Sequence, residues 1–257
     1  MLRKYSNSRS LSDNMKLGVL TAFTAGMVNV ASLILFFSFT SNVTGHYAIL
    51  AEEIASGKWF QVVVVISWIL LYMFGAFVSN FIVIHGRNRY SFLSHALPLG
   101  LEMACLLVVG FYGTFYYKET LIETEILTAL LLFSMGMQNG LTASISNFSV
   151  KTTHLTGLTT DLGIHFSLIT KRSYRKNKAV INKIKLMSAI ATAYLTGGVI
   201  AGSITIFFQF KVFFYICVTI LFIIFYDLTK MYFSLKYIKY QRRRIHKMHR
   251  GEDIRVQ

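Results

Sequence analysis

Residues 26–46 read GMVNVASLILFFSFTSNVTGH, and residues 136–157 read GMQNGLTASISNFSVKTTHLTG. Both stretches carry Gly-Met-x-Asn followed by Thr-x-x-(Val/Leu)-Thr-Gly, and the interval between the two elements differs by two residues. Each stretch includes the end of a long apolar run. Apart from a chance match, a signature that recurs after 110 residues indicates an internal repeat, and this repeat leads to the fold that we predict.

Composition places the chain among membrane proteins. It is 54% hydrophobic and 14% charged, with a mean hydropathy of +0.53, whereas a soluble domain usually carries about 25% charged residues. A bilayer core requires about 20 apolar residues in a helix, and a helix satisfies its own backbone groups in lipid. We therefore predict an all-α polytopic membrane protein with six transmembrane helices. The predicted spans are residues 17–39, 59–85, 95–117, 124–146, 184–210 and 212–233.

Two segments between these spans are too short or too polar to cross a bilayer. Each begins with the Thr-Gly pair of the repeated signature, at Thr44 and at Thr156. Because threonine is a favourable helix N-cap, we expect these residues to begin short helices over residues 44–56 and 156–171. Such helices either re-enter the membrane or lie at its interface.

The positions of lysine and arginine predict the orientation. If the N-terminus is cytoplasmic and the chain crosses six times, all but three of the 26 basic residues lie in cytoplasmic segments, the exceptions being Lys58, Lys118 and Lys211. This is the positive-inside pattern, and it explains the net charge of +15 by topology and by contact with anionic lipid head groups. Residues 1–16 and the basic residues 234–257 are interpreted as cytoplasmic tails, and we expect no nucleic-acid partner.

Each half of the chain holds three crossings, so the second copy of the repeat enters the membrane upside down. Repeat 1 covers residues 17–117 with the first short helix, and repeat 2 covers residues 118–233 with the second. Inverted repeats of this kind occur in many secondary transporters and place a shared site near the midplane of the membrane.

The two Thr-Gly motifs are the candidate substrate site. Free N–H groups and a partial positive charge at a helix N-terminus suit an anion or a polar atom, hydroxyl groups add neutral donors and acceptors, and glycine permits close approach. The alternative is that the threonines only cap two interfacial helices. The motif residues assigned to substrate binding are Thr40, Thr44, Gly45, Thr152, Thr156 and Gly157.

Amide side chains inside the predicted spans extend this site. Asn29 and Asn139 occupy matching places in the two halves, and Gln138 lies beside the second. We assign all three to substrate binding. The alternative is that these amides hold helices together, as buried polar groups in membrane proteins often do.

Three ionisable residues are candidates for ion or proton coupling. Carboxylates within membrane spans often mark proton or ion routes, and histidine relays protons near neutral pH. The candidates are Glu102 in the third predicted span, His46 in the first short helix and Asp161 in the second. The alternatives are that Glu102 reaches the cytoplasmic interface and that the short helices face water.

The chain shows no pattern typical of an enzyme. It contains no P-loop, HExxH, GxSxG or nucleotide fingerprint, so we expect neither catalysis nor a bound cofactor. Cys105 and Cys217 lie in apolar runs without metal-ligand spacing and are expected to be buried thiols.

GMVNVASLI and TSNVTGH in the first half, with GMQNGLTASIS and VKTTHLTGLTTDLG in the second, resemble the YoaK-type family of small bacterial membrane proteins, a domain family of unknown function. The resemblance covers residues 15–235, and the second motif is its more distinctive part. Family members often have Asp where this chain has Asn29 and Asn where it has His46, which weakens the case for ion coupling at position 29. The resemblance implies a six-span protein of the bacterial inner membrane, and it brings no settled substrate.

The function that we expect from these features is secondary transport of a small polar or anionic solute through a site at the repeat interface. A channel of the same architecture is one alternative, and a non-transporting membrane partner or scaffold is another. The expected partners are the lipid bilayer and an unidentified solute, and the sequence leaves a homo-oligomer open.

Overall fold

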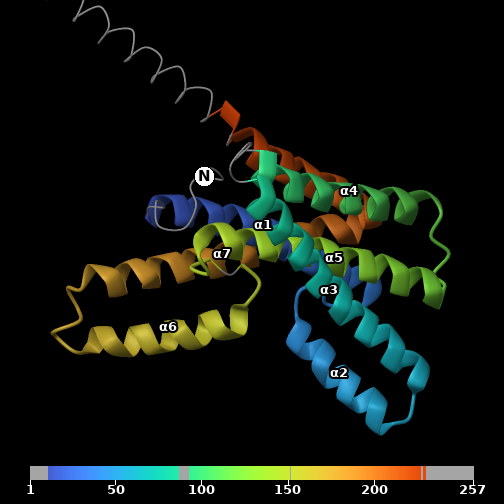
Figure 1. The fold of residues 1–257 in the computed structure, drawn as a ribbon, viewed down its shortest axis with the longest axis horizontal. Coiled ribbons are helices and arrows are strands. Elements are labelled where there is room, and N and C mark those ends of the chain that lie inside the picture. Colours follow the sequence, from blue (N-terminus) through green and yellow to red (C-terminus); the bar gives the residue numbers. More distant parts are fainter. Residues whose placement is uncertain (1–10, 87–92, 151, 227, 230–257) are drawn as a thin grey trace, which may run out of the picture. The chain divides into compact units, whose positions relative to one another are not determined.

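The computed structural model describes residues 11–86, 93–150, 152–226 and 228–229, and in these residues the chain is helical without strands. The chain divides into two compact units at residue 220, and every tertiary contact described below lies in the first unit. The predicted tail at residues 234–257 lies outside the described residues. The elements are α1 (Leu11–Phe36), α2 (Val43–Ala55), α3 (Trp59–Gly86), α4 (Leu93–Phe115), α5 (Leu121–Ser146), α6 (Leu155–Thr170), α7 (Lys178–Phe208), the 3-10 turn η2 (Gln209–Lys211) and a helix over residues 212–226 (Figure 1).

Five helical stretches in the described residues are long and apolar enough to cross a bilayer. Four of them are α1, α3, α4 and α5, and the fifth is Lys178–Tyr226, which has 49 residues. A straight helix of that length would extend about 74 Å, more than twice the hydrocarbon core of about 30 Å. Gln209 interrupts it with a left-handed φ of 46°, and the sequence prediction counts the same stretch as two spans.

The helix after this break runs back along α4. Gly110 faces Phe213, and the thiol of Cys217 donates to the Met103 carbonyl oxygen at 3.7 Å. These contacts pair increasing residue numbers on one helix with decreasing numbers on the other, so the two helices are antiparallel over this length.

α1 begins at Leu11, within the segment 1–16 predicted as a tail. The extra turn is polar. Its Asp13 lies in the first turn, where a negative side chain stabilises a helix because the N-terminal end carries a partial positive charge. Residues 1–10 lie outside the described residues.

Glycines let α1 and α7 approach closely (Figure 1). A Cβ atom at Gly26 would collide with the Tyr194 carbonyl oxygen, and one at Gly197 would collide with the Phe23 carbonyl oxygen. Only a residue without a side chain fits where two helix backbones are this near.

The same arrangement joins α3 and α5. A Cβ atom at Gly75 would collide with the Phe133 carbonyl oxygen, and one at Gly136 would collide with the Tyr72 carbonyl oxygen. Gly26 and Gly136 are the first residues of the two Gly-Met-x-Asn motifs. Each motif glycine therefore brings its helix against a long helix from the other half of the chain.

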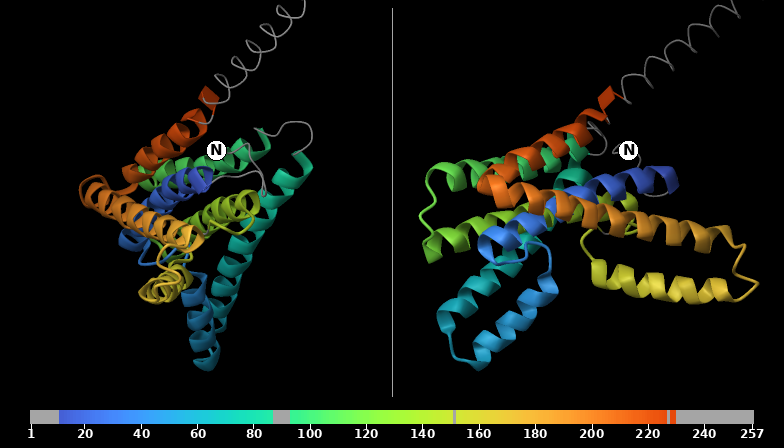
Figure 2. Two further views of the ribbon diagram at one scale, coloured as in Figure 1. Left: turned by 90° about the vertical axis from the view of Figure 1, so that its left-hand side faces the viewer. Right: turned by 180° about the vertical axis from the view of Figure 1, so that it is seen from behind.

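The two short helices predicted from the sequence are α2 and α6, which lie alongside α3 and α7 respectively (Figures 1 and 2). The prediction that threonines cap them is wrong. The N-cap residues are Asn42 and His154, and neither makes a side-chain capping bond. Thr44 and Thr156 instead lie in the first turn of each helix, because hydrogen bonds from the preceding loops to α1 and α5 fix where the helices begin.

Candidate functional site

Asn29 on α1 anchors the loop that leads into α2. Its Oδ1 accepts hydrogen bonds from the Thr40 backbone N–H at 3.0 Å, the Thr40 hydroxyl at 3.3 Å and the Ser41 hydroxyl at 3.2 Å. Its Nδ2 donates to the hydroxyl of Tyr194 on α7. Asn29 and Thr40 are both buried, so this amide both joins two helices and holds a loop.

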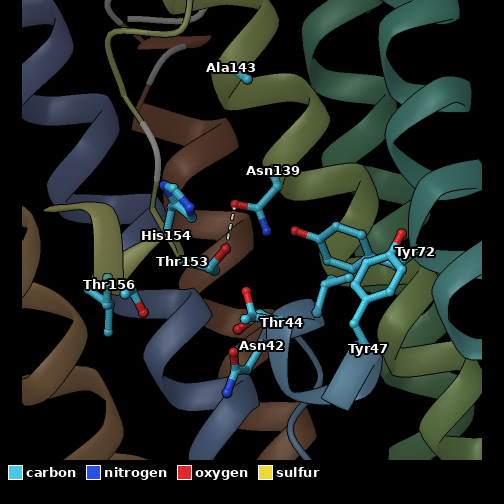
Figure 3. Close-up of a pocket in the computed structure, with 12 residues that line it drawn as sticks. Asn42, Thr44, Tyr47, Tyr72, Asn139, Ala143, Thr153, His154 and Thr156 are labelled. Carbon is cyan, nitrogen blue, oxygen red and sulfur yellow. Dashed lines mark hydrogen bonds between the residues drawn. The ribbon is translucent and has the colours of Figure 1, made fainter. Parts of the chain in front are cut away.

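Asn139 on α5 makes the corresponding contacts in the second half. Its Oδ1 accepts hydrogen bonds from the hydroxyls of Thr152 at 3.1 Å and Thr153 at 2.9 Å. Tyr72 on α3 lies next to Asn139 and Thr153, and all three side chains line the same pocket (Figure 3). An amide, two consecutive hydroxyl residues and a tyrosine from a neighbouring long helix therefore occur twice.

Both loops fold back toward the middle of the helix that precedes them. Asn29 lies seven residues before the end of α1 at Phe36, and Asn139 lies seven residues before the end of α5 at Ser146. Seven helical residues extend about 10 Å. The short helices α2 and α6 therefore begin well inside the ends of α1 and α5.

A pocket of about 440 Å³ opens where α2 and α6 begin (Figure 3). The loop and first turn of α2 contribute Ser41, Asn42 and Thr44, and those of α6 contribute Thr153, His154 and Thr156. Tyr47, Tyr72 and Asn139 complete its polar lining. The pocket therefore lies between residues of both repeated motifs.

The chemistry of this lining suits a small, uncharged or anionic polar molecule. Most of the lining residues carry hydroxyl, amide or phenol groups, and the described lining residues include no Lys, Arg, Asp or Glu. Two helix N-termini add free N–H groups and partial positive charge, while a cation would find no carboxylate there. The volume falls within the range of about 300–1,000 Å³ typical of small-molecule sites.

The remaining residues assigned to substrate binding from the sequence lie outside this lining. Asn29, Thr40 and Thr152 are buried, and the two threonines bond to Asn29 and Asn139 respectively. Gly45 is absent from the lining, and Gly157 borders a second cavity of about 590 Å³ beside α7. Gln138 points elsewhere and donates to Thr24 and Glu102.

The three candidates for coupling lie in three different places. Glu102 is fully buried at the middle of α4, so it does not reach an interface. His46 is buried, and its Nε2 lies 2.8 Å from the Phe39 carbonyl oxygen. Burial lowers the pKa of His46, and the bond to Phe39 partly opposes this change. Asp161 is exposed and borders the second cavity. In the described part of the chain, no three His, Cys, Asp or Glu side chains are grouped to hold a metal ion.

Tyr72 and Tyr194 are site residues that the sequence prediction missed. Each begins a Tyr-x-x-Gly element, YMFG at 72–75 and YLTG at 194–197, whose glycine lies at the helix contact described above. This second repeated element is short, but it occupies the same place in both halves, and a comparison of the two halves of the sequence could have found it. Ser41 and Thr153 were missed because only their neighbours belong to the repeated signature.

Comparison with known proteins gives a family and no activity. The family model described as "Protein of unknown function (DUF1275)" matches residues 17–226. No curated protein and no solved structure matches the chain.

Proposed function

Since the chain belongs to the DUF1275 family of proteins of unknown function, which supplies no activity, we propose from its pocket that it is a secondary transporter for a small polar or anionic solute. The observation that carries the proposal is the 440 Å³ pocket lined by the first turns of both α2 and α6. In transporters built from inverted repeats, broken or partial helices direct their N-termini at the substrate in this way.

The matched contacts support an inverted repeat of six crossings. The contacts of Asn29 with a hydroxyl pair and a tyrosine have their counterpart at Asn139. Three long helices, α1, α3 and α4, precede α5, so α5 crosses in the direction opposite to α1. We count the helix that begins at residue 212, after the turn at η2, as the sixth crossing.

Charge in the two short-helix turns supports opposite placement of α2 and α6. The turn after α2 holds Lys58, which pairs with Glu53 at 3.2 Å and Glu52 at 3.7 Å. The turn after α6 is basic and exposed, with Lys171, Arg172, Arg175, Lys176 and Lys178. We propose that the basic turn faces the cytoplasm and anionic lipids of a bacterial inner membrane.

Large apolar side chains cover the outside of the long helices, as a lipid-facing surface requires. On α3, Trp59, Phe60, Phe74 and Phe77 are all exposed. Exposed apolar side chains of this size would promote aggregation in water, and a bilayer would cover them.

The proposal is tested by removing one pocket hydroxyl from each repeated motif. A thermal-shift screen of polyols, amides and carboxylates on the purified protein identifies a ligand, because a ligand stabilises the folded state. Uptake of that compound into proteoliposomes is then compared for the wild type, Thr44→Val and Thr156→Val. Thr192→Val is the control, since its exposed hydroxyl bonds only within α7.

We expect uptake to fall at least about tenfold for each pocket variant, which corresponds to one lost hydrogen bond of about 1.4 kcal/mol, and to persist for the control. Unchanged uptake in both pocket variants would remove the site assignment. Binding without uptake by the wild type would favour a non-transporting membrane partner, and uptake at conductive, non-saturating rates would favour a channel.

A further inference from the structure

A second polar cluster lies inside the helix bundle, apart from the pocket. Gln138 Nε2 on α5 donates to Glu102 Oε1 on α4 at 3.0 Å and to Thr24 Oγ1 on α1 at 3.1 Å. Glu102 and Thr24 are fully buried, and Gln138 is 1% exposed. The cluster therefore joins three long helices in the core.

Two acceptor atoms in this cluster have no hydrogen-bond partner among the described residues. They are Glu102 Oε2 and Gln138 Oε1. The one described donor to the Glu102 carboxyl group is Gln138, and no described cation pairs with it. An ionised carboxylate in such a place is strongly disfavoured. Adding one proton between these two acceptors would give both of them a hydrogen bond.

A proton on Glu102 Oε2 converts that atom from an acceptor into a donor. The neutral acid then accepts from the Gln138 amide through one oxygen and donates to the amide oxygen through the other. A bound cation is the alternative way to satisfy both oxygens, and the sodium test below distinguishes it from a proton. We propose that Glu102 and Gln138 form a buried proton-binding site.

Among the described residues, the groups that interact electrostatically with Glu102 carry no fixed charge. Its electrostatic neighbours are the thiols of Cys105 on α4 and Cys217 on the helix at residues 212–226. Facing it, α5 presents the amide of Gln138 and α1 presents the hydroxyl of Thr24. Glu102 is therefore the one carboxyl group among the described members of this cluster, and the proton is assigned to it.

The position of Gln138 links the proton to the solute pocket. Gln138 and Asn139 are consecutive on α5, with the first bonded to Glu102 and the second lining the pocket. Loss of the proton removes the bond from Glu102 Oε2 on α4 to Gln138 Oε1 on α5 and leaves a buried charge between helices from the two halves of the chain. The inference that proton binding is coupled to solute movement rests on the proposed function, whereas the proton site itself does not.

Infrared spectroscopy of the full-length protein in nanodiscs tests the proton site directly. A protonated carboxyl group shows a carbonyl band that shifts on deuteration, and we expect this band at neutral pH in the wild type. Glu102→Gln should lose it, and Gln138→Leu should move it to higher frequency because the acid loses its amide partner. Glu52→Gln, at a largely exposed carboxylate, should keep the band unchanged.

A wild-type spectrum without the band at neutral pH, or one unchanged by Glu102→Gln, would overturn the proton site. Thermal stabilisation by sodium ions that Glu102→Gln abolishes would also overturn it, in favour of a metal ion. The wild-type spectrum at neutral pH decides the first point even if a variant fails to fold.

The coupling is tested separately with the compound identified by the thermal-shift screen. A pH gradient across proteoliposomes should drive its accumulation by the wild type. Glu102→Gln, fixed in a state like the protonated one, should lose the response to the gradient. If the wild type shows the carbonyl band but no uptake, the proton site stands and the proposed transport function fails. If it shows uptake but no carbonyl band, the transport function stands and the proton site fails.

Discussion

Replacing Asn139 by leucine tests whether the loop-to-helix bonds hold the site together. The substitution keeps a branched side chain of similar size but removes the acceptor for the Thr152 and Thr153 hydroxyls. Each lost bond should cost about 1 kcal/mol, so the free energy of unfolding should fall by about 2 kcal/mol. For a chain of this size that is a decrease in Tm of about 4–8 °C.

The matching substitution Asn29→Leu should cost more, about 3 kcal/mol, because Asn29 Oδ1 accepts three hydrogen bonds and one comes from a backbone N–H. Thermal unfolding of the purified variants in detergent measures both. Thr192→Val, at an exposed hydroxyl, serves as the control for a simple loss of polarity.

A double variant separates the hydrogen bond from general disruption. Adding Thr153→Val to Asn139→Leu removes the orphaned donor together with its lost acceptor, so the pair should be less destabilising than the sum of the single changes. Strict additivity, or an Asn139→Leu variant as stable as the wild type, would refute the reasoning.

Two further perturbations test the helix contact and the buried histidine. Gly136→Ala should destabilise the fold by about 1–3 kcal/mol, because the new methyl group collides with α3. The control Gly100→Ala places its methyl group in open space and should change stability by no more than about 1 kcal/mol. Equal Tm values for the two variants would argue against the close contact. Burial holds the pKa of His46 below 6.5, so the unfolded chain binds more protons between the two pKa values and stability should fall as pH decreases through 6.5. His46→Gln should flatten this dependence in unfolding experiments across pH, and an unaltered slope would count against it.

The class of the protein and the positions of its helices could be predicted from the sequence. Apolar runs as long as a bilayer is thick leave little choice of structure, and α3 at Trp59–Gly86 matches the predicted span at residues 59–85. The repeated signature also pointed to Asn29 and Asn139 as equivalent positions, because a duplicated motif is visible without any knowledge of packing.

The tertiary structure decided which hydrogen-bond partner each polar side chain has. Gln138 and Asn139 are adjacent in sequence, yet a helix turns by about 100° per residue. One side chain therefore reaches Glu102, and the other reaches Thr152 and Thr153. No local rule specifies those partners, since they come from segments brought together by packing.

The same reason explains the prediction about threonine that was wrong. Intrinsic preference favours Thr44 and Thr156 as caps, but bonds from distant asparagines hold the loops and leave both threonines at a pocket. The sequence by itself determined a helical membrane protein with a doubled signature, because hydrophobic length and repetition are properties of the chain alone. Only the tertiary structure decided that the two copies share one pocket and that Glu102 lies buried beside Gln138, because both depend on contacts between helices far apart in sequence.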